Sequence, residues 1–410
     1  MVKYIHAADI HLDSPFKGLK NIPEALFNKI KASTFNAFEK LVDTALFHQV
    51  DFVLLSGDIY DLEDRSIRAQ VFLREEIERL NQAGISVFII HGNHDYLTND
   101  ELHLSLPNNV TVFDSNVETI QFETQCHETI SISGFSYDRN WIEERKIKDY
   151  PYRNNTSDFH IGMLHGYMEG ESTSHAHYAP FTLNELKEKN YDYWALGHIH
   201  KRQQLSKEPL IYYSGNTQGR HKNEAGEKGC LLVELKKSSK KATFIPTADI
   251  KWQTINMDLT TLKTIDGMFD EIKRKITEKE YLNSLINLNI KLSPKTPKSI
   301  VNTLQDDAFY QNFQHVETDS FTYIVSASIS QRDNKDTRTS LLQTYPIAFD
   351  KALQTIGERE TFQKLTQDFF SKYAFTKYIE DDMEEIKKNS LDSAKNILMQ
   401  DLGEEISYDN

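Results

Sequence analysis

Five short apolar segments each run directly into residue types that bind divalent metal ions. The segments are residues 4–8, 52–56, 87–90, 161–164 and 193–196. The residues that follow them are Asp9-Ile10-His11, Gly57-Asp58, His91-Gly92-Asn93-His94-Asp95, His165-Gly166 and Gly197-His198-Ile199-His200. A single histidine after a strand is usually an ordinary loop residue, and a single Gly-Asp is usually a turn. Five such endings instead predict a shared site, because α/β proteins build their sites at the carboxyl ends of strands.

The candidate ligands are carboxylates, imidazoles and a carboxamide, a set that suits Mn²⁺, Fe²⁺ or Zn²⁺. The chain has two cysteines, Cys126 and Cys230, which lie far apart in the sequence. They predict neither a thiolate zinc site nor a disulfide framework, and a reducing cytoplasm is the expected compartment. Two cations about 3.5 to 4 Å apart can share one carboxylate, lower the pKa of a bridging water and hold the oxygens of a phosphate during in-line attack. The residue types therefore predict hydrolysis of a phosphate ester.

The strands that carry these endings alternate with helical patterns, which begin near Pro23 and again near Ser66. Closely spaced apolar runs then leave little room for helices and predict antiparallel strands at residues 110–113, 117–122 and 129–133. Alternation resumes after residue 160. The expected fold is therefore α/β, a sandwich of two sheets flanked by helices.

The remainder of the chain has a different pattern. Residues 252–330 alternate strand and helix in short units, which predicts a small α+β domain. A polar segment at 333–336 follows, and helical periodicity rich in aromatic residues continues to the end. We therefore expect three parts, which are a domain at 1–250 that carries the site, an α+β capping domain at 251–335 and a helical segment at 336–410.

The composition is that of a folded, soluble protein, with 410 residues, 39% hydrophobic and 26% charged. The net charge of −14 is uneven: residues 1–250 hold 27 basic and 35 acidic side chains, residues 251–340 are neutral, and residues 341–410 carry −6. An acidic surface repels a polyanion at long range. However, 14 of the 15 histidines precede residue 222, so the expected metal site should lie within residues 1–250. The N-terminal apolar run is too short for a signal or a span, so no membrane association is expected.

The motifs Asp-x-His, Gly-Asp, Gly-Asn-His-Asp, His and Gly-His-x-His occur in this order, beginning at Asp9, Gly57, Gly92, His165 and Gly197. In this order they resemble the calcineurin-like metallophosphoesterase superfamily. Within it, the chain is similar to the SbcD-type DNA repair exonucleases, and residues 11–16 and 213–220 are similar to the YhaO-like branch of that group. The resemblance covers residues 9–220. It implies the calcineurin-like phosphoesterase fold with two divalent ions, expected to be Mn²⁺.

The resemblance also assigns roles to individual residues. It implies that one metal is held by Asp9, His11 and His200, that the other is held by Asn93, His165 and His198, and that Asp58 bridges them. His94 is left free of metal, and in the family this histidine orients the scissile phosphate and can protonate the leaving oxygen. Asp95 either orients His94 or caps the loop.

Polar and basic residues after the last motif are candidates for contact with DNA phosphates. They are Arg202, Asn216 and Arg220, with Lys201, His221 and Lys222 beside them and with Arg139, Arg145 and Arg153 as weaker candidates. The alternative is an ordinary basic surface. His175 and His177 either contact substrate or a third ion, or belong to a solvated loop.

The leading interpretation is a two-metal DNA phosphodiesterase that resembles the nuclease subunit of an SbcCD-type repair complex. The resemblance implies Mn²⁺-dependent cleavage at duplex ends and in single strands, and its implied partners are DNA and an SbcC-like coiled-coil ATPase, with a homodimer inside a heterotetramer. Two alternatives stay open, a phosphodiesterase for small nucleotides and a non-catalytic scaffold of the same fold. The aromatic residues of 336–410 either dock on the ATPase or fold back on the small domain.

Overall fold

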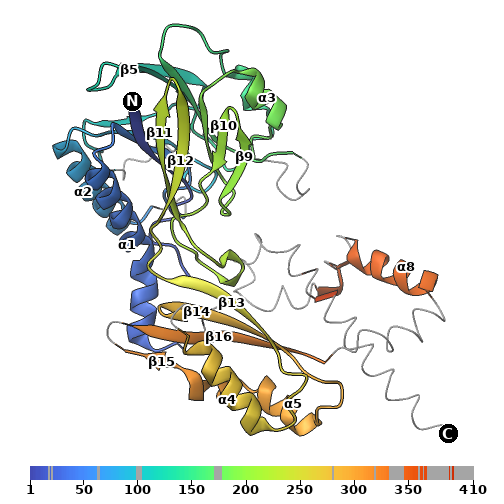
Figure 1. The fold of residues 1–410 in the computed structure, drawn as a ribbon. Helices are drawn as coiled ribbons and strands as arrows, with labels where there is room; N and C mark the ends of the chain where they lie inside the picture. Colours follow the sequence, from blue (N-terminus) through green and yellow to red (C-terminus); the bar gives the residue numbers. More distant parts are fainter. Residues whose placement is uncertain are drawn as a thin grey trace. The chain divides into compact units, whose positions relative to one another are not determined.

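The computed structural model describes residues 1–16, 19, 22–61, 65–97, 104–169, 178–278, 281–317, 320–331, 346–358, 361–362, 364–366, 387 and 390–391. It divides into two compact units, Met1–Ile290 with Pro297–Ile329 and Lys291–Thr296 with Ser330–Asn410. The five strand endings and most of the small α+β region belong to the first unit. Figure 1 shows the described helices and strands along the chain. The expected boundaries near residues 250 and 335 stay a prediction.

The first sheet is built around the N-terminal strand. Its six strands are, in order, β12 (Ser239–Pro246), β11 (Gly229–Lys236), β1 (Val2–Ala7), β2 (Phe52–Ser56), β3 (Ser86–Ile90) and β4 (Val110–Val112). Strands β1 to β4 run parallel, whereas β11 is antiparallel to both of its neighbours. The prediction of an antiparallel strand at 110–113 is wrong, because β4 pairs in parallel with β3. The 91–109 connection is long enough for the crossover that parallel neighbours need.

The second sheet lies face to face with the first. Its six strands are, in order, β5 (Glu118–Glu123), β6 (Thr129–Gly134), β7 (Phe159–His165), β8 (Tyr193–Gly197), β10 (Leu210–Tyr213) and β9 (Gln203–Lys207). The antiparallel pairing predicted for 117–122 and 129–133 is confirmed by β5 and β6. Strands β6, β7, β8 and β10 are parallel, so the carboxyl ends of β7 and β8 lie at one edge of this sheet.

Apolar side chains alternate between the two faces of the first sheet. On one face, Ile5 and Val53 pack with Leu41 of α1 (Glu24–His48) and with α2 (Ile67–Gln82). On the other, Tyr4 and Phe52 pack into a core shared with the second sheet. Each such buried side chain contributes about 1.5 to 3 kcal/mol. The two-sheet sandwich flanked by helices is therefore confirmed.

Helices α2 and α3 (Leu183–Glu188) begin at the N-cap residues Ser66 and Thr182. The Ser66 hydroxyl accepts a hydrogen bond from the amide of Ala69 at the start of α2. Helix α3 begins with a capping box, in which Thr182 and Glu185 each bind the backbone amide of the other. A 3₁₀ turn, η1 (Lys146–Asp149), lies near α3 against the outer face of the second sheet.

The strand and helix order predicted for 252–330 is found as a third sheet with helices. Its strands are, in order, β13 (Lys251–Asp258), β14 (Ser284–Lys291), β16 (Phe321–Ser330) and β15 (His315–Val316). Its helices are α4 (Ile265–Ile276), α5 (Lys298–Gln305), α6 (Asp307–Tyr310) and the 3₁₀ turn η5 (Gln311–Phe313). Leu26 and Ile30 of α1 share an apolar cluster with Trp252, Leu285 and Phe321. Helix α1 therefore packs against both the first sheet and the third sheet.

The predicted helical segment at 336–410 is described over only part of its length. Helix α8 (Pro346–Gly357) lies in it, and most of the aromatic positions that suggested a docking role fall outside the described residues. Among the described residues, no helix is both long enough and apolar enough to cross a membrane.

Candidate metal centre

The backbone bends sharply where the strands that carry the candidate ligands end. Asp9, His11 and Asp58 have φ angles of 51°, 48° and 53°, and His198 after β8 has 97°. A left-handed backbone costs a non-glycine residue on the order of 1 to 3 kcal/mol and persists only where its surroundings fix it. Here the amides of Asp9 and His11 donate to the carbonyls of Gly57 and Asp58, each at 3.0 Å, which ties the end of β1 to the end of β2.

These bends bring one group of candidate ligands together. Asp9, His11, Asp58 and His200 each offer a ligand atom within 4.8 Å of the others. The Nε2 atoms of His11 and His200 face each other at 3.2 Å. Within the described part of the chain, Asp9 Oδ2 is buried and has no hydrogen-bond partner. Because buried carboxylate oxygens are normally paired, this arrangement fits a cation held among the four residues.

The second group of candidate ligands surrounds Asn93. Its Oδ1 lies 3.1 Å from Nε2 of His165 and 3.3 Å from Nδ1 of His198. Asp58 connects the two groups, because its Oδ2 lies 3.4 Å from Nε2 of His165 and 3.8 Å from Nε2 of His11. All the residues named as metal ligands thus lie in one place, with Asp58 between them.

Burial and neighbouring charges shift the pKa values of three candidate ligands. Burial and the charge of Arg220 lower the pKa of His11 to about 3, so its imidazole is neutral at pH 7. Burial alone would raise the pKa of Asp58, but the imidazoles of His165 and His94 hold that pKa well below its usual range. Burial alone would lower the pKa of His165, but the Asp58 and Asp9 carboxylates raise it to about 9. The His165 ring is therefore protonated at pH 7.

His94 and Asp95 have different environments. The backbone amide of His94 donates to Asp58 Oδ1 at 3.0 Å, and its Nδ1 lies 3.1 Å from the carbonyl oxygen of Asp61. The Asp95 carboxylate accepts from the amides of Gly92, Asp58 and Ile59 and contacts Nδ1 of His91. These contacts agree with the loop-capping alternative for Asp95, since the imidazole that it touches is His91 rather than His94.

Two carboxylates that lie next to candidate ligand histidines were not singled out from the sequence. Asp61 Oδ1 lies 3.0 Å from Nδ1 of His11, and Glu224 Oε1 lies 2.5 Å from Nδ1 of His200. Asp61 follows Asp58 at a spacing that could have pointed to it. Glu224, in the 3₁₀ turn η3 (Lys222–Glu224), stands 24 positions after His200 with no local motif. Burial alone would raise the pKa of Glu224, but His200 beside it holds that pKa well below its usual range.

The candidate DNA contacts lie in different environments. The Arg202 guanidinium is exposed and lies 3.6 Å from the centroid of the Phe244 ring. Asn216 is buried, and its amide donates to the Gln218 carbonyl and to Glu224. Its side chain is therefore engaged inside the protein. Arg220 is partly buried and pairs with Asp61, which lies beside the metal cluster.

The remaining candidates lie on the surface or outside the described residues. Lys201, His221 and Lys222 are exposed. Arg139, Arg145 and Arg153 form ion pairs with surface carboxylates or with Asp192. His175 and His177 lie outside the described residues, so their role stays a prediction.

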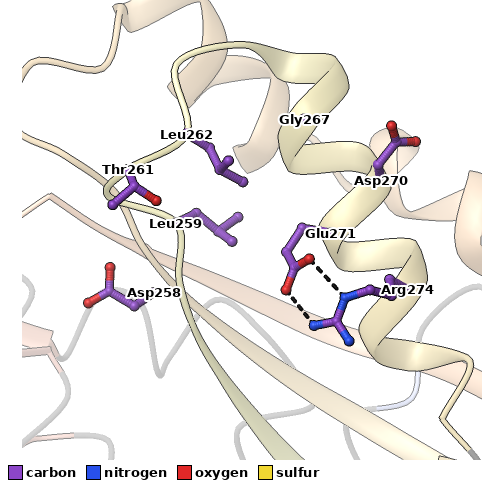
Figure 2. Close-up of a pocket in the computed structure, with 8 residues that line it drawn as sticks. All are labelled: Asp258, Leu259, Thr261, Leu262, Gly267, Asp270, Glu271 and Arg274. Carbon is purple, nitrogen blue, oxygen red and sulfur yellow. Dashed lines mark hydrogen bonds and ion pairs between the residues drawn. The ribbon is translucent and has the colours of Figure 1, made fainter.

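A pocket of about 300 Å³ lies away from the candidate ligands, in the small α+β region (Figure 2). Asp258 and Leu259 line it from the end of β13, and Asp270, Glu271 and Arg274 line it from α4. The Arg274 guanidinium is already paired with Glu271, at 2.6 Å and 2.9 Å. The pocket therefore offers no free cationic group for a phosphate.

Residues 2–202 match the family model described as calcineurin-like phosphoesterase. The chain is also 38% identical over 325 residues to an uncharacterized metallophosphoesterase, YhaO, of Bacillus subtilis, covering 78% of this chain and 79% of that protein. Fold, site and these matches define a metal-dependent hydrolase of phosphate esters. The chain belongs to the calcineurin-like phosphoesterase family.

Two more distant relatives are named for a role in DNA repair. The chain is 24% identical over 258 residues to the DNA double-strand break repair protein Mre11 of Thermoplasma acidophilum, covering 59% of this chain and 65% of that one. It is 26% identical over 264 residues to the protein of the same name from Sulfurisphaera tokodaii, covering 61% and 64%. A solved structure of a dimetal phosphatase from Danio rerio aligns with 62% of this chain and 99% of that one, with a TM-score of 0.40 and 11% identity.

Proposed function

We propose that this phosphoesterase is a DNA phosphodiesterase that works with two divalent cations, which we expect to be Mn²⁺. The observation that carries the proposal is the position of the Asp58 carboxylate, whose Oδ2 faces His165 at 3.4 Å and His11 at 3.8 Å. A carboxylate that faces two ligand groups can bridge two ions. Asp9, His11 and His200 would complete one metal position, and Asn93, His165 and His198 the other.

The side chains are held in place before any substrate arrives. The backbone of His198 donates to Asp9 Oδ1 at 3.0 Å, and Nδ1 of His165 lies 3.0 Å from the carbonyl oxygen of Ser56. These contacts fix the orientation of the Asp9 carboxylate and of the His165 imidazole within the candidate metal centre. When bound, a pair of divalent ions supplies Lewis acidity, a nucleophilic water at neutral pH and neutralisation of phosphate charge.

His94 is the proposed proton donor to the leaving oxygen. Its Nδ1–H faces the carbonyl oxygen of Asp61 at 3.1 Å, which fixes the ring orientation, and a second proton on Nε2 would be the one given to the leaving oxygen. Its backbone amide is attached to Asp58, so the ring stays beside the proposed metal pair. A donor near the reacting phosphate contributes on the order of 10² to 10⁴ in rate.

DNA is the proposed substrate because two relatives are named as DNA double-strand break repair proteins. The exposed side chains of Lys201 and Arg202 directly follow His200 and can contact phosphates next to the site. Residues 1–250 nevertheless carry more acidic than basic side chains, so a lone chain should bind DNA weakly.

A partner is therefore part of the proposal. We expect an SbcC-like coiled-coil ATPase to supply basic surface, with two copies of this chain in a heterotetramer that works in the cytoplasm. The segment 336–410, which includes α8, is the proposed docking element. Co-expression with such an ATPase should give a stable complex that binds duplex DNA more tightly and with a steeper salt dependence than either protein alone. Equal affinity with and without the ATPase would contradict this part.

The function is tested by comparing substrates and metals. Wild-type protein stripped of metal is incubated with labelled duplex DNA, labelled single-stranded DNA, cyclic dinucleotides and a chromogenic phosphodiester, with Mn²⁺ or with EDTA. Asp58→Asn is the matched control, because it removes a charge without changing shape. We expect Mn²⁺-dependent cleavage of DNA that is lost in Asp58→Asn.

Each alternative predicts a different result in this assay. Hydrolysis of cyclic dinucleotides without DNA cleavage would favour the small-nucleotide phosphodiesterase. No hydrolysis of any substrate by a protein that binds two Mn²⁺ ions would favour the non-catalytic scaffold. Either outcome would contradict the proposed DNA activity.

A further inference from the structure

Each histidine of one proposed metal position lies next to a carboxylate that is largely shielded from solvent. The Nδ1 atom of His11 lies 3.0 Å from Asp61 Oδ1, and the Nδ1 atom of His200 lies 2.5 Å from Glu224 Oε1. In each ring the other nitrogen, Nε2, faces the cluster of candidate ligands, where the two Nε2 atoms lie 3.2 Å apart. The side chains of Asp61 and Glu224 are 12% and 6% exposed, so solvent screens these contacts little.

A single residue connects the two carboxylates. The Arg220 guanidinium pairs through Nη1 with Asp61 Oδ1 and donates through the same atom to Ser14 Oγ at 3.2 Å. The Arg220 backbone amide donates to Glu224 Oε2 at 2.7 Å. Asn216 donates to the same oxygen at 2.9 Å. Arg220 therefore contacts Asp61 with its side chain and Glu224 with its backbone.

The other proposed metal position is supported differently. Nδ1 of His165 lies 3.0 Å from the carbonyl oxygen of Ser56, which is a neutral acceptor. An anionic acceptor makes an imidazole a stronger metal ligand than a neutral one, and loss of such a partner costs 10- to 100-fold in metal affinity. The two proposed metal positions therefore differ in the groups next to their histidines. His11 and His200 have carboxylates at Nδ1, whereas His165 has a neutral carbonyl oxygen there.

We propose that Arg220 is a positioning residue that holds Asp61 and Glu224 against His11 and His200 and thereby sets the affinity of this one metal position. Its guanidinium acts inside the protein rather than on DNA phosphates. This inference rests on the proposed two-metal function but not on DNA as the substrate. It predicts that a change at Arg220 weakens one of two bound ions and leaves the other nearly unchanged.

The test measures metal binding instead of activity. Metal-stripped Arg220→Met is titrated with Mn²⁺, and the free ion is followed by electron paramagnetic resonance. The matched control is Arg79→Met, because the Arg79 guanidinium is also paired with carboxylates, those of Asp43 and Glu76, but lies on α2. We expect Arg220→Met to weaken one Mn²⁺ position by 10- to 100-fold and to leave the other within threefold, with both unchanged in Arg79→Met.

A second variant tests the same metal position without changing Arg220. Glu224→Gln keeps the side-chain shape but removes the charge beside His200, so it should weaken the same single position. Thermal unfolding of the metal-free variants checks that each one folds. Two wild-type Mn²⁺ affinities in folded Arg220→Met would overturn the proposal, and so would an equal loss at both positions.

DNA binding separates this inference from a direct phosphate contact. Anisotropy of a labelled duplex is measured in EDTA at low salt for wild type and Arg220→Met. We expect equal DNA affinity. Weaker DNA binding with unchanged Mn²⁺ affinities would show that Arg220 contacts DNA and would overturn the positioning role. If wild type binds two Mn²⁺ ions but cleaves no DNA, only the proposed function fails, since the effect of Arg220→Met on metal is measured independently.

Discussion

The Asp58 carboxylate accepts a hydrogen bond from the backbone amide of His94 at 3.0 Å. The loop that carries the candidate proton donor is therefore attached to the carboxylate that faces both ligand groups. One oxygen of Asp58, Oδ1, holds this loop, and the other, Oδ2, faces His11 and His165. Changes at Asp58 and at His94 should consequently have different effects on metal binding.

Asp58→Asn should remove metal from both positions. The amide oxygen can still accept from the His94 backbone, so the loop stays in place while the shared negative charge is lost. We expect wild type to bind two Mn²⁺ ions per chain and Asp58→Asn to bind neither at micromolar concentration. His200→Ala, as a comparison, should weaken mainly one ion. Metal counting on gel-filtered protein measures this, and two tightly held ions in Asp58→Asn would refute the bridge.

His94→Asn should separate metal binding from chemistry. The backbone bond to Asp58 does not depend on the side chain at position 94, so the metal content should equal that of wild type. The rate of phosphodiester cleavage should fall on the order of 10² to 10⁴. Single-turnover kinetics with saturating Mn²⁺ measure the change. A variant that keeps both ions and the wild-type rate would make His94 an ordinary loop residue.

Metal affinity should increase as pH rises toward 9. The pKa of His165 is raised to about 9 in the metal-free protein, so at pH 7 this ring is protonated and must release its proton before it can bind a cation. Between pH 6 and 8 the affinity of its metal position should increase about tenfold per pH unit. Calorimetry in buffers of different ionisation enthalpy measures the proton release, and no release at pH 7 would contradict the assignment.

The same shift should make the metal-free protein less stable at alkaline pH. His165 has a folded pKa of about 9, above the value of 6.5 expected for the unfolded chain. Its contribution to stability is therefore complete below pH 6.5 and is lost as the pH rises through 9. Urea unfolding in EDTA should show this loss, and His165→Gln should reduce it. An identical pH profile for both proteins would show that His165 is not the group responsible.

Gly197→Ala should destabilise the protein and disturb the site. A Cβ at this position would lie 2.0 Å from the carbonyl oxygen of Ser56 and 2.8 Å from Nδ1 of His165. Such overpacking costs about 1 to 3 kcal/mol or more in the free energy of unfolding, and displacement of His165 should weaken metal binding as well. Gly267→Ala in α4 is the control, since its nearest contact would be 3.3 Å and alanine favours helix. Equal unfolding midpoints for both variants would contradict the tight approach.

Much of the fold and the clustering of the candidate ligands could be predicted, because strands of a parallel sheet bring their carboxyl ends to one edge. Asp9, Asp58 and His165 each follow an apolar run, so the sequence itself marks them. The parallel pairing of β4 could not be predicted from a three-residue strand. A strand this short shows no pairing preference of its own, so the tertiary fold decides its partner.

The supporting residues were harder to predict for a different reason. Glu224 contacts His200 through a loop that has no periodic pattern, so only the folded chain brings the two together. Arg220 and Asn216 looked like contacts for phosphate, since a basic or polar residue in a loop is usually exposed. The ion pair of Arg220 with Asp61 spans 159 positions and has no local signal.

The location of bound Mn²⁺ is the most direct test of the two-metal site. Crystals grown with Mn²⁺ are measured near the manganese absorption edge, and an anomalous difference map locates each ion. We expect two peaks, one among Asp9, His11 and His200 and the other among Asn93, His165 and His198, with the Asp58 carboxylate in contact with both. A single peak, or two peaks that Asp58 does not join, would contradict the two-metal site.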